Sequence, residues 1–436
     1  MRDIPQFVIA APSSGAGKTT VARGLMSLLR GEGLTVQPFK CGPDYIDTKF
    51  HAAVCGRQSV NLDLFMAGEG HVRELYGYYS AGADVCVVEG MMGMYDGYDR
   101  SSGSTADIAR TLGLPVVLVA DARSAAYSLA PLLYGFTKFD TGVTVAGVIF
   151  NRVGSERHRQ MLRRVCSDLG IECFGFLSRR SVDIVSSRYL GLDFSGGTGN
   201  DITPMISEGV DWRRLLSACT RPCRESAAPW TNLPRIAGDI VVARSDEAFS
   251  FIYQEHLDML RMMGHVTEFD PESDEPLPAD TSLLYLPGGY PENRAAGLSA
   301  ARNTLKSIRS YAARGGRVLA ECGGMMYLCR SIATDEGVFE MAGVLPHDIT
   351  ARPVERRLSL GYRRFAFGGR EVRGHEFHYS RFVGDEPQSI TQVYNASGEP
   401  VRSAILRAGN TIAGYTHIYW GGETAPTDFF RPSDND

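Results

Sequence analysis

Hydrophobic residues in the first half of the chain occur in short runs that alternate with segments of helical apolar spacing. The runs FVIAAP (7–12), PVVLVAD (115–121) and VTVAGVIFNRV (143–153) are rich in β-branched residues. By contrast, Thr19–Arg30 has the apolar spacing of an amphipathic helix. Regular alternation of the two patterns is typical of βαβ units, in which the strands run parallel. The pattern therefore predicts an α/β fold with a mostly parallel sheet.

The same alternation returns after an interruption rich in Pro, Ser, Arg and Ala, which predicts a linker at 218–235. The linker would separate a domain at 1–217 from a domain at 236–436. In the second domain, apolar runs precede and follow predicted helices at 249–263 and 300–314. Beyond residue 343 the predicted strands have fewer helices between them. The sequence thus predicts two α/β domains.

Composition and charge exclude several classes of partner. The 436 residues are 44% hydrophobic and 22% charged, which is ordinary for a globular protein. A net charge of −5 gives no basic surface for nucleic acid or for an anionic membrane. The nine scattered cysteines and the absence of a signal-peptide pattern predict a reducing, cytoplasmic location. No apolar stretch approaches the ~20 residues that span a bilayer. The sequence leaves open whether the chain forms a homo-oligomer.

The segment IAAPSSGAGKTT (9–20) follows a predicted strand and opens a predicted helix, which is the context of a phosphate-binding loop. Its GKT core matches the end of the motif, but Pro12 stands where the first glycine is expected. Glycines let backbone N–H groups face phosphate oxygens, the lysine neutralises them, and the threonine reaches Mg²⁺. The predicted ATP-binding residues are Ser14, Gly15, Gly17, Lys18, Thr19 and Thr20.

Acidic residues follow two further predicted strands, where a metal bound to ATP would need them. The segment KCGPDYID (40–47) supplies Asp44 and Asp47, and VCVVEGMMGMYDG (85–97) supplies Glu89 and Asp96. Glu89 ends an apolar strand and is therefore the strongest predicted Mg²⁺ ligand beside the loop threonine. The three aspartates have an alternative interpretation, because aspartate beside Gly or Pro also forms turns.

A cysteine ends another predicted strand in RVLAECGGMMYL (317–328). A strand, a sharp turn and a helix form an elbow of the kind that presents a nucleophile. The helix dipole is expected to lower the pKa of the Cys322 thiol. A buried structural cysteine is the alternative interpretation.

A thiolate that attacks a carbonyl needs a base and donors for the oxyanion. The backbone N–H groups of Gly288, Gly289 and Gly323 are the predicted oxyanion donors. His417, in the late predicted strand GYTHIYW, is the predicted base. The segment RGHEFHYS (373–380) offers competing histidines.

Together these segments resemble the glutamine-dependent cobyrinic acid a,c-diamide synthases of cobalamin biosynthesis. The resemblance spans nearly the whole chain and is carried by GAGKTT, KCGPDYIDT, VEGMMGMYDG, LPGGYPE, AECGGMMYL and YTHIYW. The loop core is common to many ATPases, whereas the acidic segments together with the cysteine elbow are specific. The resemblance implies an N-terminal dethiobiotin-synthetase-like ATPase domain and a C-terminal class I glutamine amidotransferase domain.

The resemblance also implies a mechanism with glutamine and ATP as substrates. Cys322 would release ammonia from glutamine through a thioester, and ATP would convert a carboxylate of the corrinoid acid into an acyl phosphate that ammonia displaces. The four acidic positions match those that the family places near metal and substrate. The sequence does not divide the acidic residues between metal and corrinoid. The division adopted here takes Thr19, Asp44 and Glu89 as metal ligands and Asp47 and Asp96 as substrate contacts. Tyr45, which lies between the two aspartates of the first segment, is a further expected substrate contact, with ordinary loop packing as its alternative interpretation.

One departure from the wider amidotransferase pattern concerns the third member of the catalytic triad. Tyr419 stands two residues after His417, where an acid is common. Members of the resembled family share this absence, and Glu376 is a candidate for orienting the histidine instead.

Alternative functions remain open at this stage. The substrate could be another tetrapyrrole, such as hydrogenobyrinic acid or a nickel-loaded sirohydrochlorin, or the chain could catalyse the later cobyric acid step, which the GPDYID and MYDG segments disfavour. A partition-type ATPase would share the variant loop, but it predicts an early lysine where Ser13 and Ser14 stand and leaves Cys322 unexplained. An amidotransferase half that is inactive and relies on external ammonia is disfavoured by the presence of both Cys322 and His417.

Overall fold

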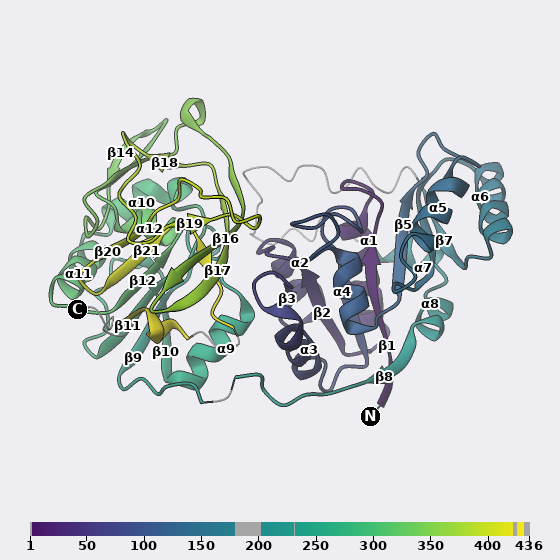
Figure 1. Ribbon diagram of the computed structural model, residues 1–436, viewed down its shortest axis with the longest axis horizontal. Helices are drawn as coiled ribbons and strands as arrows, with labels where there is room; N and C mark the ends of the chain where they lie inside the picture. Colours follow the sequence, from purple (N-terminus) through teal and green to yellow (C-terminus); the bar gives the residue numbers. More distant parts are fainter. Residues whose placement is uncertain (1, 179–201, 231, 422–424, 431–436) are drawn as a thin grey trace. The chain divides into compact units, whose positions relative to one another are not determined.

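The structure, a computed structural model, describes residues 2–178, 202–230, 232–421 and 425–430 (Figure 1). The chain divides into two compact units, Met1–Pro229 and Trp230–Asp436. The division falls inside the predicted linker, but the first unit extends further than predicted. Strand β8 (Thr220–Cys223) pairs antiparallel with β1 (Arg2–Ala10), and Cys219 and Cys223 are buried. Part of the segment predicted as a linker therefore belongs to the first sheet.

The first unit is built on one sheet with the strand order β3-β2-β4-β1-β5-β6-β7, to which β8 adds at β1. The seven strands of the main path pair in parallel, which confirms the predicted α/β class. The remaining strands are β2 (Val36–Cys41), β3 (Val60–Leu62), β4 (Val85–Glu89), β5 (Val116–Asp121), β6 (Val145–Val153) and β7 (Cys173–Ser178). The helices are α1 (Lys18–Gly31), α2 (Asp47–Cys55), α3 (Gly68–Tyr79), α4 (Thr105–Leu112), α5 (Leu129–Lys138), α6 (Glu156–Leu169), α7 (Thr203–Gly209) and α8 (Trp212–Ala218).

Apolar strands at the centre of this sheet are buried because helices cover both faces. Ile9 of β1, Val87 of β4 and Val119 of β5 pack with Leu25 of α1 in one core cluster. The continuous β-branched runs of the sequence are the residues that such two-sided burial requires. The carboxyl ends of β1, β2 and β4 consequently lie next to one another, and the segments that follow them carry most of the predicted ATP-site residues.

The second unit contains a six-stranded sheet with the order β10-β9-β11-β12-β21-β20. Only β20 runs antiparallel to its neighbour. Two four-stranded sheets accompany it, with the orders β14-β13-β15-β18 and β19-β16-β17-β22. The strands of the large sheet are β9 (Asp239–Ala243), β10 (His265–Phe269), β11 (Thr281–Leu286), β12 (Val318–Glu321), β20 (Ile405–Ala408) and β21 (Thr411–Gly414). The strands of the smaller sheets are β13 (Ser331–Thr334), β14 (Gly337–Glu340), β15 (Asp348–Thr350), β16 (Ser359–Phe367), β17 (Arg370–His378), β18 (Arg381–Phe382), β19 (Val393–Tyr394) and β22 (His417–Ile418).

The described α-helices of this unit all precede the strands of the two small sheets, which agrees with the prediction of fewer helices late in the chain. They are α9 (Gln254–Met263), α10 (Ala295–Ala300), α11 (Arg302–Ala313) and α12 (Gly323–Leu328), and short 3₁₀ turns lie at η2 (Pro271–Ser273), η3 (Pro291–Arg294), η4 (Pro353–Glu355) and η5 (Pro426–Phe430). The helix predicted at 249–263 begins only at Gln254, because the preceding residue Tyr253 is in an extended conformation.

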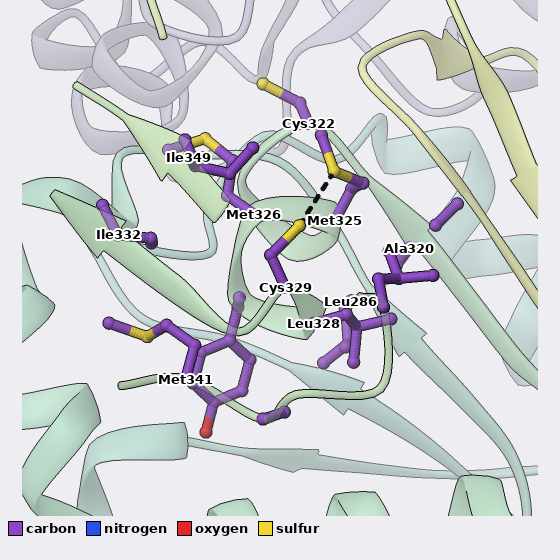
Figure 2. Close-up of a cluster of buried hydrophobic side chains, with 14 of the residues drawn as sticks. Leu286, Ala320, Cys322, Met325, Met326, Leu328, Cys329, Ile332, Met341 and Ile349 are labelled. Carbon is purple, nitrogen blue, oxygen red and sulfur yellow. Dashed lines mark hydrogen bonds between the residues drawn. The ribbon is translucent and has the colours of Figure 1, made fainter. Parts of the chain in front are cut away.

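An apolar cluster surrounds the turn between β12 and α12 (Figure 2). Met325 and Met326 of the helix pack there with Leu286 of β11 and Ile349 of β15. A Cβ atom on Gly324 would lie 2.0 Å from the carbonyl oxygen of Leu286. The second glycine of the elbow is therefore needed so that α12 can pack directly against β11.

Candidate active sites

The phosphate-binding loop connects β1 to α1 in the first unit. Gly17 caps the helix with a φ of 103°, a backbone conformation that favours glycine. A Cβ atom at this position would lie 2.2 Å from Nδ2 of Asn151, which donates a hydrogen bond of 2.8 Å to the Ala16 carbonyl. Lys18 donates to the carbonyl oxygens of Ser13 and Met92. The loop is thus tied both to β6 and to the segment after β4.

Glu89 lies fully buried at the end of β4, directly beside the start of α1. Its Oε1 atom accepts hydrogen bonds from Thr19 Oγ1 at 2.7 Å and from Lys40 Nζ at 3.0 Å. Its Oε2 atom lies 2.7 Å from Nε2 of His51. Although burial acts to raise the pKa of Glu89, Lys40 and His51 outweigh it and hold that pKa well below the usual range. Glu89 is therefore a charged carboxylate in contact with the predicted loop threonine.

Lys40 joins Glu89 to the acidic segment after β2. Its Nζ atom is 2.7 Å from Asp47 Oδ2 and 3.8 Å from Asp44 Oδ2. Burial and the neighbouring Glu89 raise the pKa of Asp47. Asp44 Oδ1 accepts the backbone N–H groups of Ile46 and Asp47, each at 2.9 Å, so it also forms the turn that starts α2.

The other predicted site residues of the first unit differ in exposure. Asp96 is exposed in the loop after β4, where its carboxylate accepts the Gly93 N–H at 2.8 Å. Tyr45 and Thr20 are buried, and Ser14 is exposed. Their proposed roles toward substrate and ATP stay predictions.

Sequence reasoning missed Lys40 and His51, both of which contact Glu89. Lys40 could have been found, because it pairs directly with Glu89 in the parallel register of β2 and β4. His51 lies on α2 and reaches the carboxylate only through tertiary packing. No local pattern in the sequence marks it.

Within the described ranges, no cluster of three or more His, Cys, Asp or Glu side chains is arranged to hold a metal ion. The residues present nevertheless fit Mg²⁺ bound together with a nucleotide. Thr19 and Glu89 place a hydroxyl and a carboxylate oxygen 2.7 Å apart at the loop. Oxygen donors of this kind are what Mg²⁺ takes from a protein when phosphates and water complete its shell.

The cysteine elbow lies at the end of β12 in the second unit. Cys322 has a φ of 49° and a ψ of −108°, which is strained for a residue other than glycine. Its backbone N–H donates to the Gly414 carbonyl at 2.7 Å, and its carbonyl accepts the Met326 N–H at 2.9 Å. The neighbouring strand and helix therefore hold the strained residue in place, as the elbow interpretation requires.

The expected lowering of the Cys322 pKa is wrong. Burial raises the pKa of the thiol, and the nearby Glu292 raises it further. Hydrogen bonds from the backbone N–H groups of Gly323 and Gly289 act in the opposite direction but do not outweigh burial. The helix that follows is only six residues long, so its dipole is small. These two N–H groups, together with that of Gly288, stay the predicted oxyanion donors.

His417 lies fully buried on β22, close to the loop that follows β11. A Cβ atom on Gly288 would lie 2.1 Å from Cε1 of His417, so the absence of a side chain at Gly288 leaves room for the imidazole. Burial and the neighbouring His375 and His378 lower the pKa of His417 to about 3. The imidazole is therefore neutral at physiological pH, which is the protonation state that a general base has before the reaction.

The two competing histidines have other contacts. His378 stacks on Tyr415 with ring centroids 3.6 Å apart, and its Nδ1 atom lies 2.9 Å from the Ser380 carbonyl oxygen. His375 pairs with His417 across the antiparallel register of β17 and β22. These contacts favour His417 as the base, which stays a prediction.

Replacing Gly288 with Ala is expected to displace the imidazole of His417. Because the new methyl carbon would overlap Cε1, we expect kcat for glutamine hydrolysis to fall by roughly a hundredfold. Steady-state assays of glutamate release measure this loss. Amidation supported by ammonium is the internal control and is expected to persist. Unchanged glutamine hydrolysis would contradict the placement of His417.

The raised thiol pKa predicts the pH dependence of Cys322 alkylation in the absence of glutamine. Since only the thiolate reacts, the rate with iodoacetamide is expected to rise about tenfold per pH unit from pH 7 to pH 9 without a plateau. Peptide mass spectrometry isolates Cys322 from the other cysteines, and Cys322→Ser is the blank. A plateau below pH 8 would instead indicate a thiolate stabilised by the helix.

A phosphate-loop unit and a cysteine-elbow unit with a buried histidine, joined in one chain, define a glutamine amidotransferase coupled to a nucleotide-binding domain. The comparisons with known proteins agree with this class. Residues 7–188 match the profile of the CobQ/CobB/MinD/ParA nucleotide binding domain, and residues 239–425 match that of the CobB/CobQ-like glutamine amidotransferase domain.

Similar proteins extend over nearly the whole chain. Cobyrinate a,c-diamide synthase of Gloeobacter violaceus is 39% identical over 435 residues, which cover 95% of this chain and 94% of that protein. Hydrogenobyrinate a,c-diamide synthase of Mycobacterium tuberculosis (strain H37Rv) is 39% identical over 449 residues and covers 95% of both chains. The chain belongs to the family of cobyrinate and hydrogenobyrinate a,c-diamide synthases. It is accordingly an ATP-dependent carbon–nitrogen ligase that takes its nitrogen from glutamine.

Solved structures resemble the chain only in part. FtsY of Thermotoga maritima aligns with a TM-score of 0.32 and 18% identity, covering 40% of this chain and 62% of that chain, which is too little to support an argument. Among the described helices, none has the length and apolar character to cross a membrane.

Proposed function

We propose that the protein amidates the a and c carboxylates of cobyrinate, using ATP to activate each carboxylate and glutamine to supply ammonia. The observation that carries this proposal is the likeness over 95% of the chain to a cobyrinate a,c-diamide synthase. Two further features of the chain support it. The contact between Thr19 and Glu89 fits an ATP·Mg²⁺ site, and the Cys322 elbow beside Gly289 fits a glutaminase site.

At the glutaminase site, Cys322 is the proposed nucleophile and His417 the proposed base. His417 takes the thiol proton as sulfur attacks the amide carbon of glutamine, and it then protonates the departing ammonia. The backbone N–H groups of Gly289 and Gly323 bind the oxyanion, and Gly288 leaves space for the imidazole. Water then hydrolyses the thioester and releases glutamate. Before glutamine binds, burial keeps both the thiol of Cys322 and the imidazole of His417 neutral. In the proposed reaction, the proton moves from sulfur to imidazole only as sulfur attacks the bound glutamine.

At the ATP site, the loop N–H groups and Lys18 bind and neutralise the phosphates. Thr19, Glu89 and the second oxygen of Asp44 would hold Mg²⁺, which neutralises charge on the transferring phosphoryl group. A carboxylate oxygen of the substrate attacks the γ-phosphorus, ADP leaves, and an acyl phosphate results. Ammonia attacks the acyl carbon, and phosphate leaves as the amide forms.

Three further residues are proposed to contact the corrinoid acid, and these are Asp47, Asp96 and Tyr45. Asp47 lies 2.7 Å from Lys40, so the ammonium group neutralises a carboxylate that the acidic substrate would otherwise meet. The assembly state of the chain and its place in the cytoplasm stay predictions.

Hydrogenobyrinate is the second candidate substrate, because the relative from Mycobacterium tuberculosis with that name is as similar as the cobyrinate enzyme. A direct test offers cobyrinate, hydrogenobyrinate and nickel sirohydrochlorin separately, each with Mg·ATP and glutamine. Mass spectrometry is expected to find cobyrinate converted to a diamide. Conversion of only one of the other two would reassign the substrate and keep the reaction.

The acyl phosphate has a test of its own. When the substrate carboxylates carry ¹⁸O, each amide formed should transfer one ¹⁸O atom to inorganic phosphate. Phosphate without the label would exclude the intermediate.

A further inference from the structure

The segment 416–420 around His417 is fixed by buried polar contacts that the sequence does not reveal. Tyr419 stands where wider amidotransferases have the acid of the triad, and its hydroxyl donates to the Glu255 carboxylate. The Trp420 N–H donates to Nε2 of His256 at 3.1 Å. The two residues that flank His417 in the chain, Thr416 and Ile418, each donate a hydrogen bond to a buried glutamate. These two bonds bear most directly on the position of His417.

On one side, Thr416 contacts Glu376 of β17. Thr416 Oγ1 donates to Glu376 Oε1 at 2.8 Å, and both side chains are about 1% exposed. The other oxygen of Glu376 accepts from Nε of Arg363 at 2.9 Å, and Ser403 also donates to the carboxylate. Burial acts to raise the pKa of Glu376, but Arg363 and the neighbouring donors outweigh it and leave that pKa lowered. Glu376 is thus a fixed, charged acceptor.

On the other side, the Ile418 N–H donates to Oε1 of Glu321 at 3.2 Å. Glu321 is 2% exposed, and its Oε2 atom accepts the Tyr285 hydroxyl at 2.8 Å. It immediately precedes Cys322 in the chain. One buried side chain therefore links the strand that carries the proposed nucleophile to the strand that carries the proposed base.

We propose that Glu321 and Glu376 are positioning residues that together hold the backbone of His417 in register with Cys322. They act on both flanks of the histidine, in place of an acid two residues after it. This inference rests on the proposed glutaminase function. It also refines the expectation from sequence, in which Glu376 alone was the candidate for orienting His417.

The strand that carries His417 needs such support. β22 is two residues long. Its register with β17 pairs Gly374 with Ile418 and His375 with His417, and one further backbone bond runs from the Tyr419 N–H to the Arg373 carbonyl at 2.9 Å. So short a strand is weakly fixed by its own ladder. The hydrogen bond to the charged Glu376 is stronger than a neutral one and has a defined direction. Burial raises the pKa of Glu321 to about 8, so Glu321 acts as a buried acceptor of fixed position rather than as a charge. Because displacement by about 1 Å can cost a hundredfold in rate, these bonds bear directly on catalysis.

Substitutions of nearly equal shape test the pair. Thr416→Val removes the hydroxyl that contacts Glu376, and Thr416→Ser restores it. Glu321→Leu removes the acceptor for Ile418, and Glu321→Gln keeps one acceptor oxygen. Thr411→Val is the matched control, since Thr411 is fully buried on β21, the strand that precedes β22 in the chain, and its hydroxyl has no hydrogen-bond partner among the described residues.

Each variant is assayed for kcat and KM of glutamine hydrolysis and for amidation with ammonium. We expect Thr416→Val and Glu321→Leu to lower kcat with glutamine roughly 10–100-fold, with KM and the ammonium rate within about twofold. Thr416→Ser, Glu321→Gln and Thr411→Val should stay within about fivefold of wild type. If Glu321→Leu does not fold, the inference is tested by comparing the glutamine-dependent kcat of Thr416→Val with that of Thr416→Ser.

Two results would overturn the inference. One is that Thr416→Val behaves like Thr411→Val, and the other is that both nitrogen sources lose activity equally, which indicates a general loss of structure. Failure of the proposed function would look different, because wild type itself would then release no glutamate from glutamine.

Discussion

Replacement of Cys322 by Ala is expected to abolish amidation with glutamine while leaving amidation with ammonium intact. The thiol is the only group proposed to form a bond with glutamine, so its loss should lower glutamine-dependent activity by at least a thousandfold, roughly the loss on removing an enzyme's nucleophile. The alanine side chain is smaller than the thiol and fits the strained elbow, where φ is 49°. Mass spectrometry of the corrinoid product, with glutamine or ammonium chloride as nitrogen source, measures both activities.

The matched control is Cys329→Ala, because Cys329 belongs to the same apolar cluster and lies 3.7 Å from Met325 Sδ (Figure 2). It should keep glutamine-dependent activity within about threefold, although truncation of a buried side chain lowers stability by about 1 kcal/mol. Loss of ammonium-dependent activity in Cys322→Ala would contradict the separation of the two sites. Retention of glutamine-dependent activity would assign the nucleophile to another residue.

Replacement of Lys18 by Ala is expected to abolish amidation with either nitrogen source. The lysine is proposed to supply the positive charge that the β and γ oxygens need in the transition state, and removal of one such group typically costs about 10²–10³ in rate. Glutamine hydrolysis should persist, since its proposed residues all lie in the second unit. Paired assays of ADP and glutamate release separate the two effects.

Arg213→Ala provides the control for Lys18→Ala, because its guanidinium makes an exposed ion pair with Glu32 in the same unit. Exposed pairs of this kind contribute little, so both activities should remain unchanged. If Lys18→Ala keeps its ATP-dependent activity, the loop is not the site of phosphoryl transfer, even though its sequence resembles a phosphate-binding loop.

The parts of the sites that the sequence predicted are those encoded in contiguous segments. The helix begins at Lys18, one residue before the predicted Thr19, and Cys322 ends a strand of four apolar or buried residues as the elbow pattern requires. A strand followed by glycine and a helix is determined mainly by local backbone preferences. For this reason the motifs predicted the loop before α1 and the elbow at Cys322 without knowledge of tertiary contacts, while the roles of their residues stay predictions.

Tertiary packing decided what the sequence could not supply. His51 reaches Glu89 from helix α2, and Glu321 contacts Ile418 from 97 positions away in the chain. The pKa of Cys322 depends on how completely the elbow is buried, which the dipole argument ignored. The effect of burial on the thiol pKa is larger than the effect of the short helix dipole, so the predicted lowering of that pKa was wrong.

The extent of the first domain has the same kind of explanation. Residues 220–223 lie in a segment rich in Pro, Ser and Arg, and composition alone favours a linker. Their pairing with Arg2–Pro5 is antiparallel and joins segments more than two hundred residues apart. No local sequence pattern predicts this strand, because its pairing partner lies at the other end of the domain's sequence.

The central claim is that this one chain moves nitrogen from glutamine to two carboxylates of cobyrinate. The most direct measurement is mass spectrometry of cobyrinate incubated with the protein, Mg·ATP and glutamine labelled with ¹⁵N at the amide. We predict a diamide in which each new amide carries one ¹⁵N, and no product when ATP is omitted. Unchanged cobyrinate, or amides without the label, would contradict the claim.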